Sequence, residues 1–391
     1  MKEWLRPETS LPADHADAIL VGRAWVPAVG PTLVRIRGHE VQDLSAVAPT
    51  SSQLLELEDP AGAVRQARGL PRVASLEDTL ANSACRGRDE TMPWFLAPCD
   101  LQPIKASGVT FVSSLLERVI EEQARGDSTK AAGLRRSITS VIGDNLQAVR
   151  PGSDGSQRLK DVLIAQGAWS QYLEVGIGPD AEIFTKAPPM SAVGTGADVG
   201  IHPKSAWNNP EPEIVLAVNS AGRTVGAALG NDVNLRDFEG RSALLLGKAK
   251  DNNASCAIGP FIRLFDGAFT IDTVRQCELA LHIAGSDGFG LTAHSSMAKI
   301  SRDPLDLVEQ TIGAHHQYPD GLMLFLGTMF APTIDRAGAG KGFTHLAGDI
   351  VIVETPGLGA LANRVDYTDR IARWTFGTGA LMKNLSHRGL L

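Results

Sequence analysis

The stretch that decides the fold runs from Trp207 to Pro260 and begins Trp-Asn-Asn-Pro-Glu-Pro-Glu-Ile-Val-Leu-Ala-Val (residues 207–218). Glu211 and Glu213 are two residues apart, and side chains at that spacing on an extended strand point to the same face. The apolar, β-branched residues 214–218 have the composition of a buried strand. Pro212 restricts Glu211 to extended geometry. The stretch therefore predicts two carboxylates that converge at the start of a strand.

Two neighbouring carboxylates repel each other unless a positive charge lies between them. A divalent cation is the simplest candidate, and hard oxygen ligands favour Mg²⁺, Mn²⁺ or Ca²⁺ over Zn²⁺. Asp232 ends a Gly-Asn-Asp turn after a second apolar run and supplies a third carboxylate. We predict that Glu211, Glu213 and Asp232 bind one divalent cation. The alternative is that the Glu-x-Glu pair is only the solvated edge of a strand.

The order of motifs in this stretch resembles that of the fumarylacetoacetate hydrolase superfamily. The family pattern is a Glu-x-Glu pair, a Gly-x-Asp-x-(Ser/Thr)-x-Arg-Asp turn, and a Lys shortly before Gly-Pro. Here it reads Glu211-Pro212-Glu213, Gly230 to Asp237, and Lys250 before Gly259-Pro260, with Asn234 in place of Ser or Thr. The resemblance extends from about Leu101 to the C-terminus. Within the superfamily, the chain most resembles the 2-keto-3-deoxypentonate dehydratases of sugar-acid catabolism.

This resemblance implies an α+β, β-rich fold, with a mixed β-roll catalytic domain at residues 97–391. Residues 1–96 are expected to form a small N-terminal α+β domain. The 40 glycines and the low aromatic content of 5% suit a turn-rich β architecture. Residues 126–173 are polar, and we interpret them as a lid-like excursion, with a plain surface insertion as the alternative. Alternating apolar residues predict a strand at 277–283, and helical spacing predicts a helix beginning near Phe111.

The predicted helix presents Ser114 and Glu117, one turn apart, on one side. In the family's hydrolases, a His and a Glu at these two positions form the dyad that activates the attacking water. Serine has no group that titrates near neutral pH, so Ser114 cannot take a proton from water as imidazole does. The hydrolytic dyad is therefore missing. The alternative interpretation of Ser114 is an ordinary exposed helix serine.

Further site residues follow from the resemblance. It points to Glu182, at the start of a strand-like segment, as a catalytic acid/base, with Asp180 as competitor and a plain surface glutamate as the alternative. Lys250 is expected near the metal with a lowered pKa, where it stabilises an enolate or removes the C3 proton of a 2-oxo acid. The implied substrate contacts are Lys186, Arg236, Asp237 and Thr328.

These residues suit a Mg²⁺-dependent hydro-lyase, with Mn²⁺ as a second possible metal. The expected reaction converts a 2-keto-3-deoxypentonate, such as the D-xylonate derivative, to 2,5-dioxopentanoate in pentose catabolism. One alternative is hydrolysis of a C–C bond in acylpyruvates or other diketo acids, and another is decarboxylation of oxaloacetate-like acids. A structural Ca²⁺ site is the non-enzymatic alternative. Lys250 counts against it, because a calcium cage gains nothing from a nearby cation.

The composition of the chain argues against some classes of binding partner. Its 391 residues carry a formal net charge of -7, which gives no electrostatic footprint for nucleic acid. No apolar run approaches the length of a membrane span, and the N-terminus lacks an apolar signal region. The four cysteines show no metal-binding spacing. We expect a cytoplasmic enzyme with reduced thiols that acts on a small 2-oxo sugar acid, and the resemblance implies a homo-oligomer, a dimer or tetramer.

Overall fold

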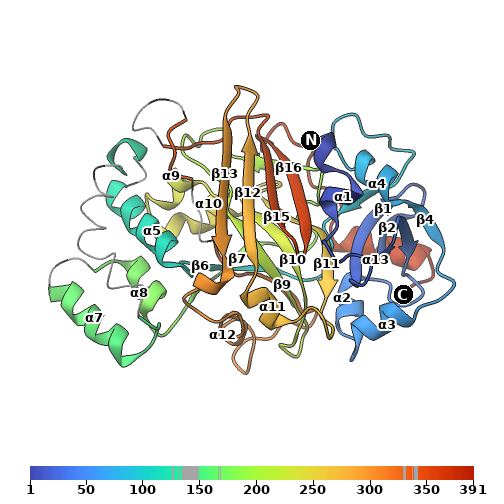
Figure 1. Cartoon of the computed structure of the whole chain (residues 1–391), viewed down its shortest axis with the longest axis horizontal. Coiled ribbons are helices and arrows are strands. Elements are labelled where there is room, and N and C mark those ends of the chain that lie inside the picture. Colours follow the sequence, from blue (N-terminus) through green and yellow to red (C-terminus); the bar gives the residue numbers. More distant parts are fainter. Residues whose placement is uncertain are drawn as a thin grey trace.

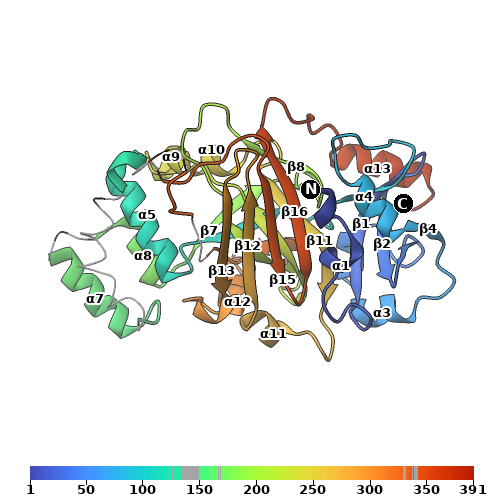
Figure 2. The same cartoon turned by 45° about the horizontal axis from the view of Figure 1, so that its top comes forward.

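Two mixed β-sheets lie at the centre of the molecule in the computed structural model (Figure 1). The structure describes residues 1–125, 127–131, 133, 149–165, 167, 169–328, 332–336, 338 and 342–391. Most of the described helices lie at the two ends of the molecule, on either side of the sheets (Figures 1 and 2). The predicted α+β, β-rich fold is confirmed.

The larger sheet contains eleven strands within the described residues, and only β14 and β6 run parallel in it. Its order is β4 (Arg72–Ser75), β3 (Glu40–Asp43), β2 (Gly30–Arg37), β1 (Leu20–Val26), β11 (Cys256–Leu264), β10 (Thr224–Asp232), β9 (Pro212–Val218), β14 (Leu322–Phe325), β6 (Ile104–Gly108) and β7 (Glu182–Ala187), with β5 (Trp94–Leu96) on β1. Every residue of β9 is buried. Burial on both faces explains its continuous apolar run.

The smaller sheet packs over the larger one. Its order is β13 (Gly290–Ser296), β12 (Glu278–Ala284), β15 (Ile350–Thr355), β16 (Gly359–Tyr367) and β8 (Asp198–Ile201). Alternate residues of β12 are buried, as the sequence pattern predicts. Leu279 and Leu281 of β12 share one apolar core with Ile214 and Leu216 of β9. The main core therefore lies between the two sheets.

The described helices fall into three groups. One end of the molecule holds α5 (Val112–Ala124), α7 (Asp154–Ala165) and α8 (Gln171–Ile177), and α5 begins beside Phe111 as predicted. The other end holds α1 (Pro7–Ser10), α2 (Ser51–Leu55), α3 (Pro60–Gln66), α4 (Leu76–Asn82) and α13 (Thr378–His387). Between them lie α9 (Arg236–Glu239), α10 (Leu246–Lys250), α11 (Ile271–Arg275) and α12 (Pro304–Glu309). Within the predicted lid-like excursion, residues 126, 132, 134–148, 166 and 168 lie outside the described residues.

The N-terminal strands continue the larger sheet. Leu20 and Val21 of β1 pair with Arg263 and Ile262 of β11 in antiparallel register. Asp100 connects this N-terminal region to the rest of the chain through hydrogen bonds. Its carboxylate accepts them from the backbone N–H groups of Ser51 and Ser52 at 2.7 and 3.0 Å. The boundary expected at residue 96 remains a prediction.

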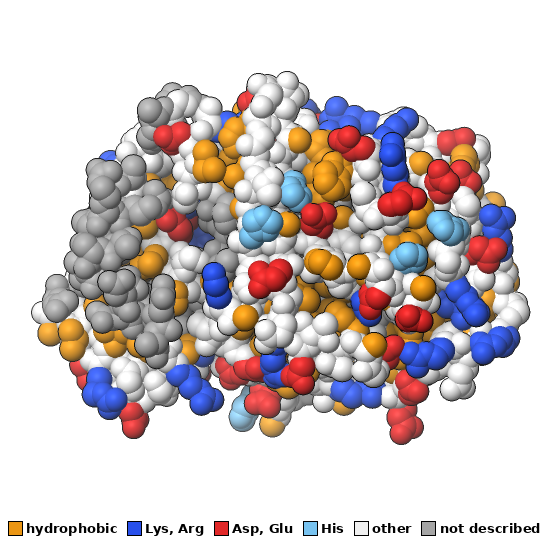
Figure 3. Space-filling view, viewed as in Figure 1, with side chains coloured by type: hydrophobic (Ala, Val, Ile, Leu, Met, Phe, Trp, Pro, Cys, Tyr) orange, Lys and Arg blue, Asp and Glu red, His pale blue; other side chains and the backbone are white. Residues whose placement is uncertain are grey.

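The distribution of surface charge and the state of the cysteines agree with what the composition predicts. Acidic and basic side chains are mixed over the face shown in Figure 3 rather than gathered in one basic patch. All four cysteines are free. Among the described helices, none combines the length and the apolar character that a membrane crossing requires.

Candidate active site

Three carboxylates meet where β9 begins and β10 ends. The two strands are antiparallel neighbours with Glu213 opposite Gly230, and the backbone N–H of Asp232 donates to the carbonyl of Glu211 at 3.0 Å. One carboxylate oxygen each from Glu211, Glu213 and Asp232 lies within 4.8 Å of the others. The three residues are only 1–3% exposed. The strand spacing thus assembles the predicted triad in a buried place.

The electrostatics of this triad fit a divalent cation. Glu213 Oε2 accepts a hydrogen bond from the N–H of Gly327 at 2.7 Å, but Glu213 forms no ion pair within the described residues. Burial, with Asp232 and Glu211 close by, raises the pKa of Glu213 well above its usual range. The adjoining cavity of about 20 Å³ has room for one small species. Three carboxylate oxygen donors, of which Glu213 has no cation beside it within the described residues, are a set that Mg²⁺, Mn²⁺ or Ca²⁺ prefers.

Lys250, the last residue of α10, points its ammonium at two of the three carboxylates. Its Nζ lies 2.5 Å from Glu211 Oε2 and 2.8 Å from Asp232 Oδ2. Burial alone favours neutral lysine, but Asp232, Glu211 and Glu239 outweigh it and raise the pKa of Lys250 above its ordinary value. The expected lowering of this pKa is wrong, because the expectation counted the apolar neighbours and omitted the carboxylates.

Arg118 is a second cation at the site, and the sequence analysis missed it. Its Nη2 lies 2.5 Å from Glu211 Oε1, and its Nη1 lies 2.8 Å from Glu121 and 3.0 Å from Glu239. The available signal was its position one helical turn after Ser114, which places both on one side of α5. Glu239 was missed as well, although it follows the Arg-Asp of the recognised turn by two residues.

Glu182 opens β7 and lines the same cavity as the triad. Its partner on β6 is Gly108, and a Cβ placed at position 108 would lie 1.9 Å from Glu182 Oε2. Glycine at position 108 therefore leaves room for the carboxyl group. Burial, followed by the charge of Glu239, raises the pKa of Glu182 to about 7. A carboxyl group that titrates near neutrality suits proton transfer.

Two further predicted residues reach the cavity. Ser114 and Thr328 line it and are each 7% exposed. The Ser114 hydroxyl donates to the carbonyl of Phe111 at 2.9 Å. The interpretation of Ser114 as an exposed helix serine is therefore wrong. Its burial in the first turn of α5 places it where a hydrolase's histidine is expected.

Four predicted residues are not brought to the cavity, because other partners hold them. Lys186 is fully buried behind Asp232, with its Nζ 2.7 Å from Asp232 Oδ1. Arg236 pairs with Glu121 at 2.6 Å and with Glu117 at 3.1 Å. Asp237 accepts hydrogen bonds from the Ser205 hydroxyl at 2.7 Å and the Ala206 N–H at 2.9 Å. The cavity's described lining omits Lys186, Arg236, Asp237 and Glu117.

Comparisons with known proteins agree with this geometry. Residues 165–366, just over half of the chain, match the family profile described as fumarylacetoacetate (FAA) hydrolase C-terminal. A probable 2-keto-3-deoxyxylonate dehydratase of Haloferax volcanii is 27% identical over 194 residues, covering 50% of this chain and 63% of that protein. A 2-dehydro-3-deoxy-D-arabinonate dehydratase of Saccharolobus solfataricus is 29% identical over 184 residues, covering 47% of this chain and 58% of that protein.

The solved structures extend the likeness to most of the chain. A 2-keto-3-deoxy-D-arabinonate dehydratase complexed with magnesium and 2,5-dioxopentanoate superposes with a TM-score of 0.61 at 20% identity. The superposition covers 89% of this chain and 99% of that one. At this identity the likeness establishes the fold. The matched segments of the two sequence relatives span less than two thirds of their own lengths.

We predict that Glu213→Gln abolishes Mg²⁺ binding and stabilises the metal-free protein. The amide keeps the size of the side chain but removes a carboxyl group whose charge is disfavoured by burial and by Asp232 and Glu211, so folding no longer has to bury or neutralise it. Isothermal titration calorimetry measures the first effect, and urea unfolding in EDTA measures the second. Glu117→Gln, outside the cavity, is the control and should bind Mg²⁺ as the wild type does. Unchanged Mg²⁺ affinity in Glu213→Gln would contradict the assignment of the triad.

Glu182 gives a prediction for stability against pH. Its folded pKa of about 7 lies above the unfolded value near 4.5, so the wild type loses stability as pH rises from about 4.5 to 7. Glu182→Gln avoids this loss, and it should be more stable than the wild type at pH 8 by on the order of 2–3 kcal/mol and nearly equal to it at pH 4.5.

Urea unfolding in EDTA at the two pH values checks this difference. Glu309→Gln replaces an exposed glutamate of α12 and should leave stability unchanged at both values. A Glu182→Gln variant that gains nothing at pH 8 would show that burial does not disfavour the Glu182 carboxylate.

Proposed function

Because the chain belongs to the fumarylacetoacetate hydrolase family, we propose that it is a Mg²⁺-dependent dehydratase that converts a 2-keto-3-deoxypentonate to 2,5-dioxopentanoate and water. One observation carries the proposal: the triad, Lys250 and Glu182 border one cavity that also contains Ser114. The names of the two sequence relatives and of the magnesium-containing solved structure support it.

The two sequence relatives point to closely related substrates. Once C2 is a ketone and C3 a methylene group, C4 is the only stereocentre left in the pentonate. The 2-keto-3-deoxy derivatives of D-xylonate and D-arabinonate are therefore one compound. We propose this D compound as the substrate.

The triad would hold the metal ion in this reaction. When bound by Glu211, Glu213 and Asp232, Mg²⁺ supplies Lewis acidity to the carboxylate and keto oxygens of a 2-oxo acid. Lys250, as a charged ammonium group beside these carboxylates, adds positive charge where the keto oxygen becomes negative. The raised pKa of Lys250 favours this electrostatic role over removal of the C3 proton.

Glu182 is the residue to which we assign the proton transfers. With a pKa of about 7, its carboxyl group exchanges a proton readily near neutral pH. It takes the proton from C3 and returns it to the C4 hydroxyl, which leaves as water with its bonding electrons. A proton then leaves C5 and one is added at C3, which converts the C3=C4 alkene to the C4=C5 enol, and tautomerisation of that enol gives the aldehyde at C5.

Hydrolysis of a diketo acid finds less support at this site. It requires a group that takes a proton from the attacking water. No histidine lines the cavity in the part of the chain that the structure describes, and the Ser114 hydroxyl is directed to the Phe111 carbonyl. Dehydration requires no attacking water, so the lack of a histidine does not hinder it.

The direct test is incubation with Mg²⁺ and 2-keto-3-deoxy-D-pentonate, with mass spectrometry to detect loss of water and an aldehyde reagent to detect the product. We expect turnover that EDTA abolishes and Mg²⁺ restores. The L enantiomer is the comparison for C4 specificity, and an acylpyruvate is the comparison for C–C cleavage. Faster cleavage of the acylpyruvate than dehydration of the pentonate would contradict the proposal. Ser114→His is expected to bring no gain in dehydration.

Gly108→Ala provides a second prediction. Its Cβ would displace the Glu182 carboxyl group without touching the triad, so kcat should fall by roughly 10²–10⁴-fold while Mg²⁺ affinity stays unchanged. Steady-state kinetics and calorimetry measure the two quantities. Gly267→Ala, with open space around its Cβ, is the matched control. Wild-type turnover in Gly108→Ala would remove Glu182 from the proton-transfer role.

A further inference from the structure

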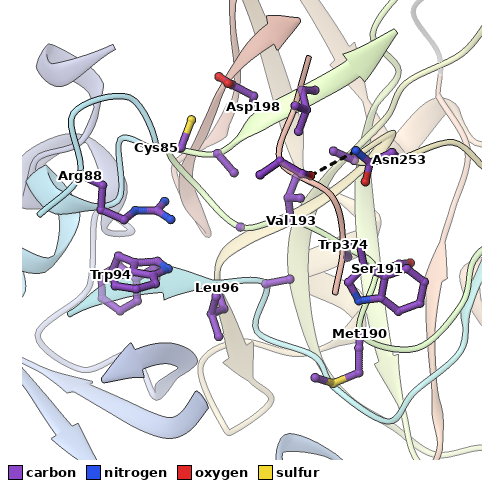
Figure 4. Close-up of a pocket in the computed structure, with 18 of the residues that line it drawn as sticks. Cys85, Arg88, Trp94, Leu96, Met190, Ser191, Val193, Asp198, Asn253 and Trp374 are labelled. Carbon is purple, nitrogen blue, oxygen red and sulfur yellow. Dashed lines mark hydrogen bonds between the residues drawn. The ribbon is translucent and has the colours of Figure 1, made fainter. Parts of the chain in front are cut away.

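A second cavity, larger than the one at the triad, lies between the N-terminal region and the C-terminal end of the chain. Its volume is about 560 Å³, within the range of small-molecule sites. The walls come from residues 85–97, the β7–β8 connection, Asn253 and Ala254, and a stretch that we call the tail segment (residues 368–377) (Figure 4). No described residue lines both cavities. A ligand here would not occupy the triad.

The walls of this cavity are mainly apolar and include two indole rings. Figure 4 shows Trp94 and Trp374 on opposite sides of it, with Leu96 and Val193 between them. Trp94 is held by stacking on Trp25 at a centroid distance of 5.8 Å. Trp374 is 48% exposed although it lines a pocket. Two indoles on opposite sides of an apolar floor suit a flat hydrophobic body.

The charge of the cavity is positive. Arg88 lies 4.7 Å from the centroid of the Trp94 ring, and within the described residues it forms no ion pair. Its Nε and Nη2 donate only to the backbone carbonyls of Asn82 and Ser83, at 3.3 and 3.0 Å. Burial lowers the pKa of Arg88, and the nearby Cys85, Glu90 and Asp198 offset this effect only in part.

Two further arginines and a neutralised carboxylate complete this charge pattern, and one of the two, Arg86, is already paired with Asp366. Arg370 of the tail segment also lines the cavity, and its guanidinium contacts the ring of Tyr367. Asp198 is the only carboxylate in the described lining, and Arg364 already pairs with it at 2.6 Å. Among the residues that the structure describes, neither Arg88 nor Arg370 forms an ion pair, so two guanidinium groups beside this apolar pocket are available to an anion.

We propose that this cavity binds a small organic anion with a flat apolar body. The negative group faces Arg88, where it makes charge-assisted hydrogen bonds, and the body lies between Trp94 and Trp374. The two features are independent observations, because the indoles specify the body and the unpaired guanidinium groups specify the charge. This site is separate from the proposed reaction and stands whether or not the chain is a dehydratase.

Calorimetry with 1-naphthoate tests the proposal on the full chain in EDTA. This probe has a flat apolar body and one carboxylate, and 1-naphthalenemethanol is its uncharged counterpart. We expect one 1-naphthoate per chain and about tenfold or weaker binding of the alcohol, which corresponds to ~1.4 kcal/mol. Equal affinity for the two compounds, or no binding of 1-naphthoate at about 1 mM, would overturn the proposal.

Two variants locate the bound probe. Ala372→Trp puts a large side chain into the cavity from an exposed position of the tail segment, and it should abolish binding. Arg88→Gln should weaken binding about tenfold. Arg373→Gln, an arginine of the same segment that does not line the cavity, is the matched control and should leave binding unchanged. Unaltered 1-naphthoate binding in Ala372→Trp would place the probe elsewhere and refute the site.

Discussion

Repulsion among three buried carboxylates sets the requirements for the rest of this site. Glu211, Glu213 and Asp232 lie within 4.8 Å of one another, and charges removed from water interact far more strongly than at a surface. The chain supplies cations from three separate elements: Lys250 from α10, Lys186 from β7 and Arg118 from α5. Together they contact Glu211 and Asp232 but leave Glu213 without a cation. Because Glu213 has no cation beside it in the part of the chain that the structure describes, the triad can accept one more positive charge.

The same constraint determines how the helical end of the molecule is attached. Arg118 joins Glu211 to Glu121 and Glu239, and Arg236 joins Glu121 to Glu117. This network of alternating charge connects α5 and α9 to the start of β9. The position of α5, which carries Ser114 and Arg118, is therefore held by ion pairs to the triad as well as by apolar packing.

Local patterns made part of this site predictable. The spacing of Glu211 and Glu213 and the turn at Asp232 act within a few residues, so strand geometry alone brings them together. Arg118 lies 93 residues from Glu211, and its contact depends on how α5 packs. Lys186 and Arg236 match the family pattern, yet whether a side chain enters a cavity or supports it from behind is decided by tertiary packing. The direction of the Lys250 pKa shift follows from three carboxylates, Asp232, Glu211 and Glu239, all of which lie outside α10.

The position of β14 has a consequence for the way this chain folds. In the larger sheet β14 lies between β9, which carries Glu213, and the β6–β7 pair, which carries Glu182. The two halves of the cavity come together across a short strand that is synthesised more than a hundred residues after both of them. Contacts so distant in sequence form slowly. A nascent chain that has emerged only as far as β13 therefore lacks the strand that joins Glu182 to the triad, and a chain interrupted before residue 322 has a nearly complete set of site residues without the strand that holds the two halves of the cavity together.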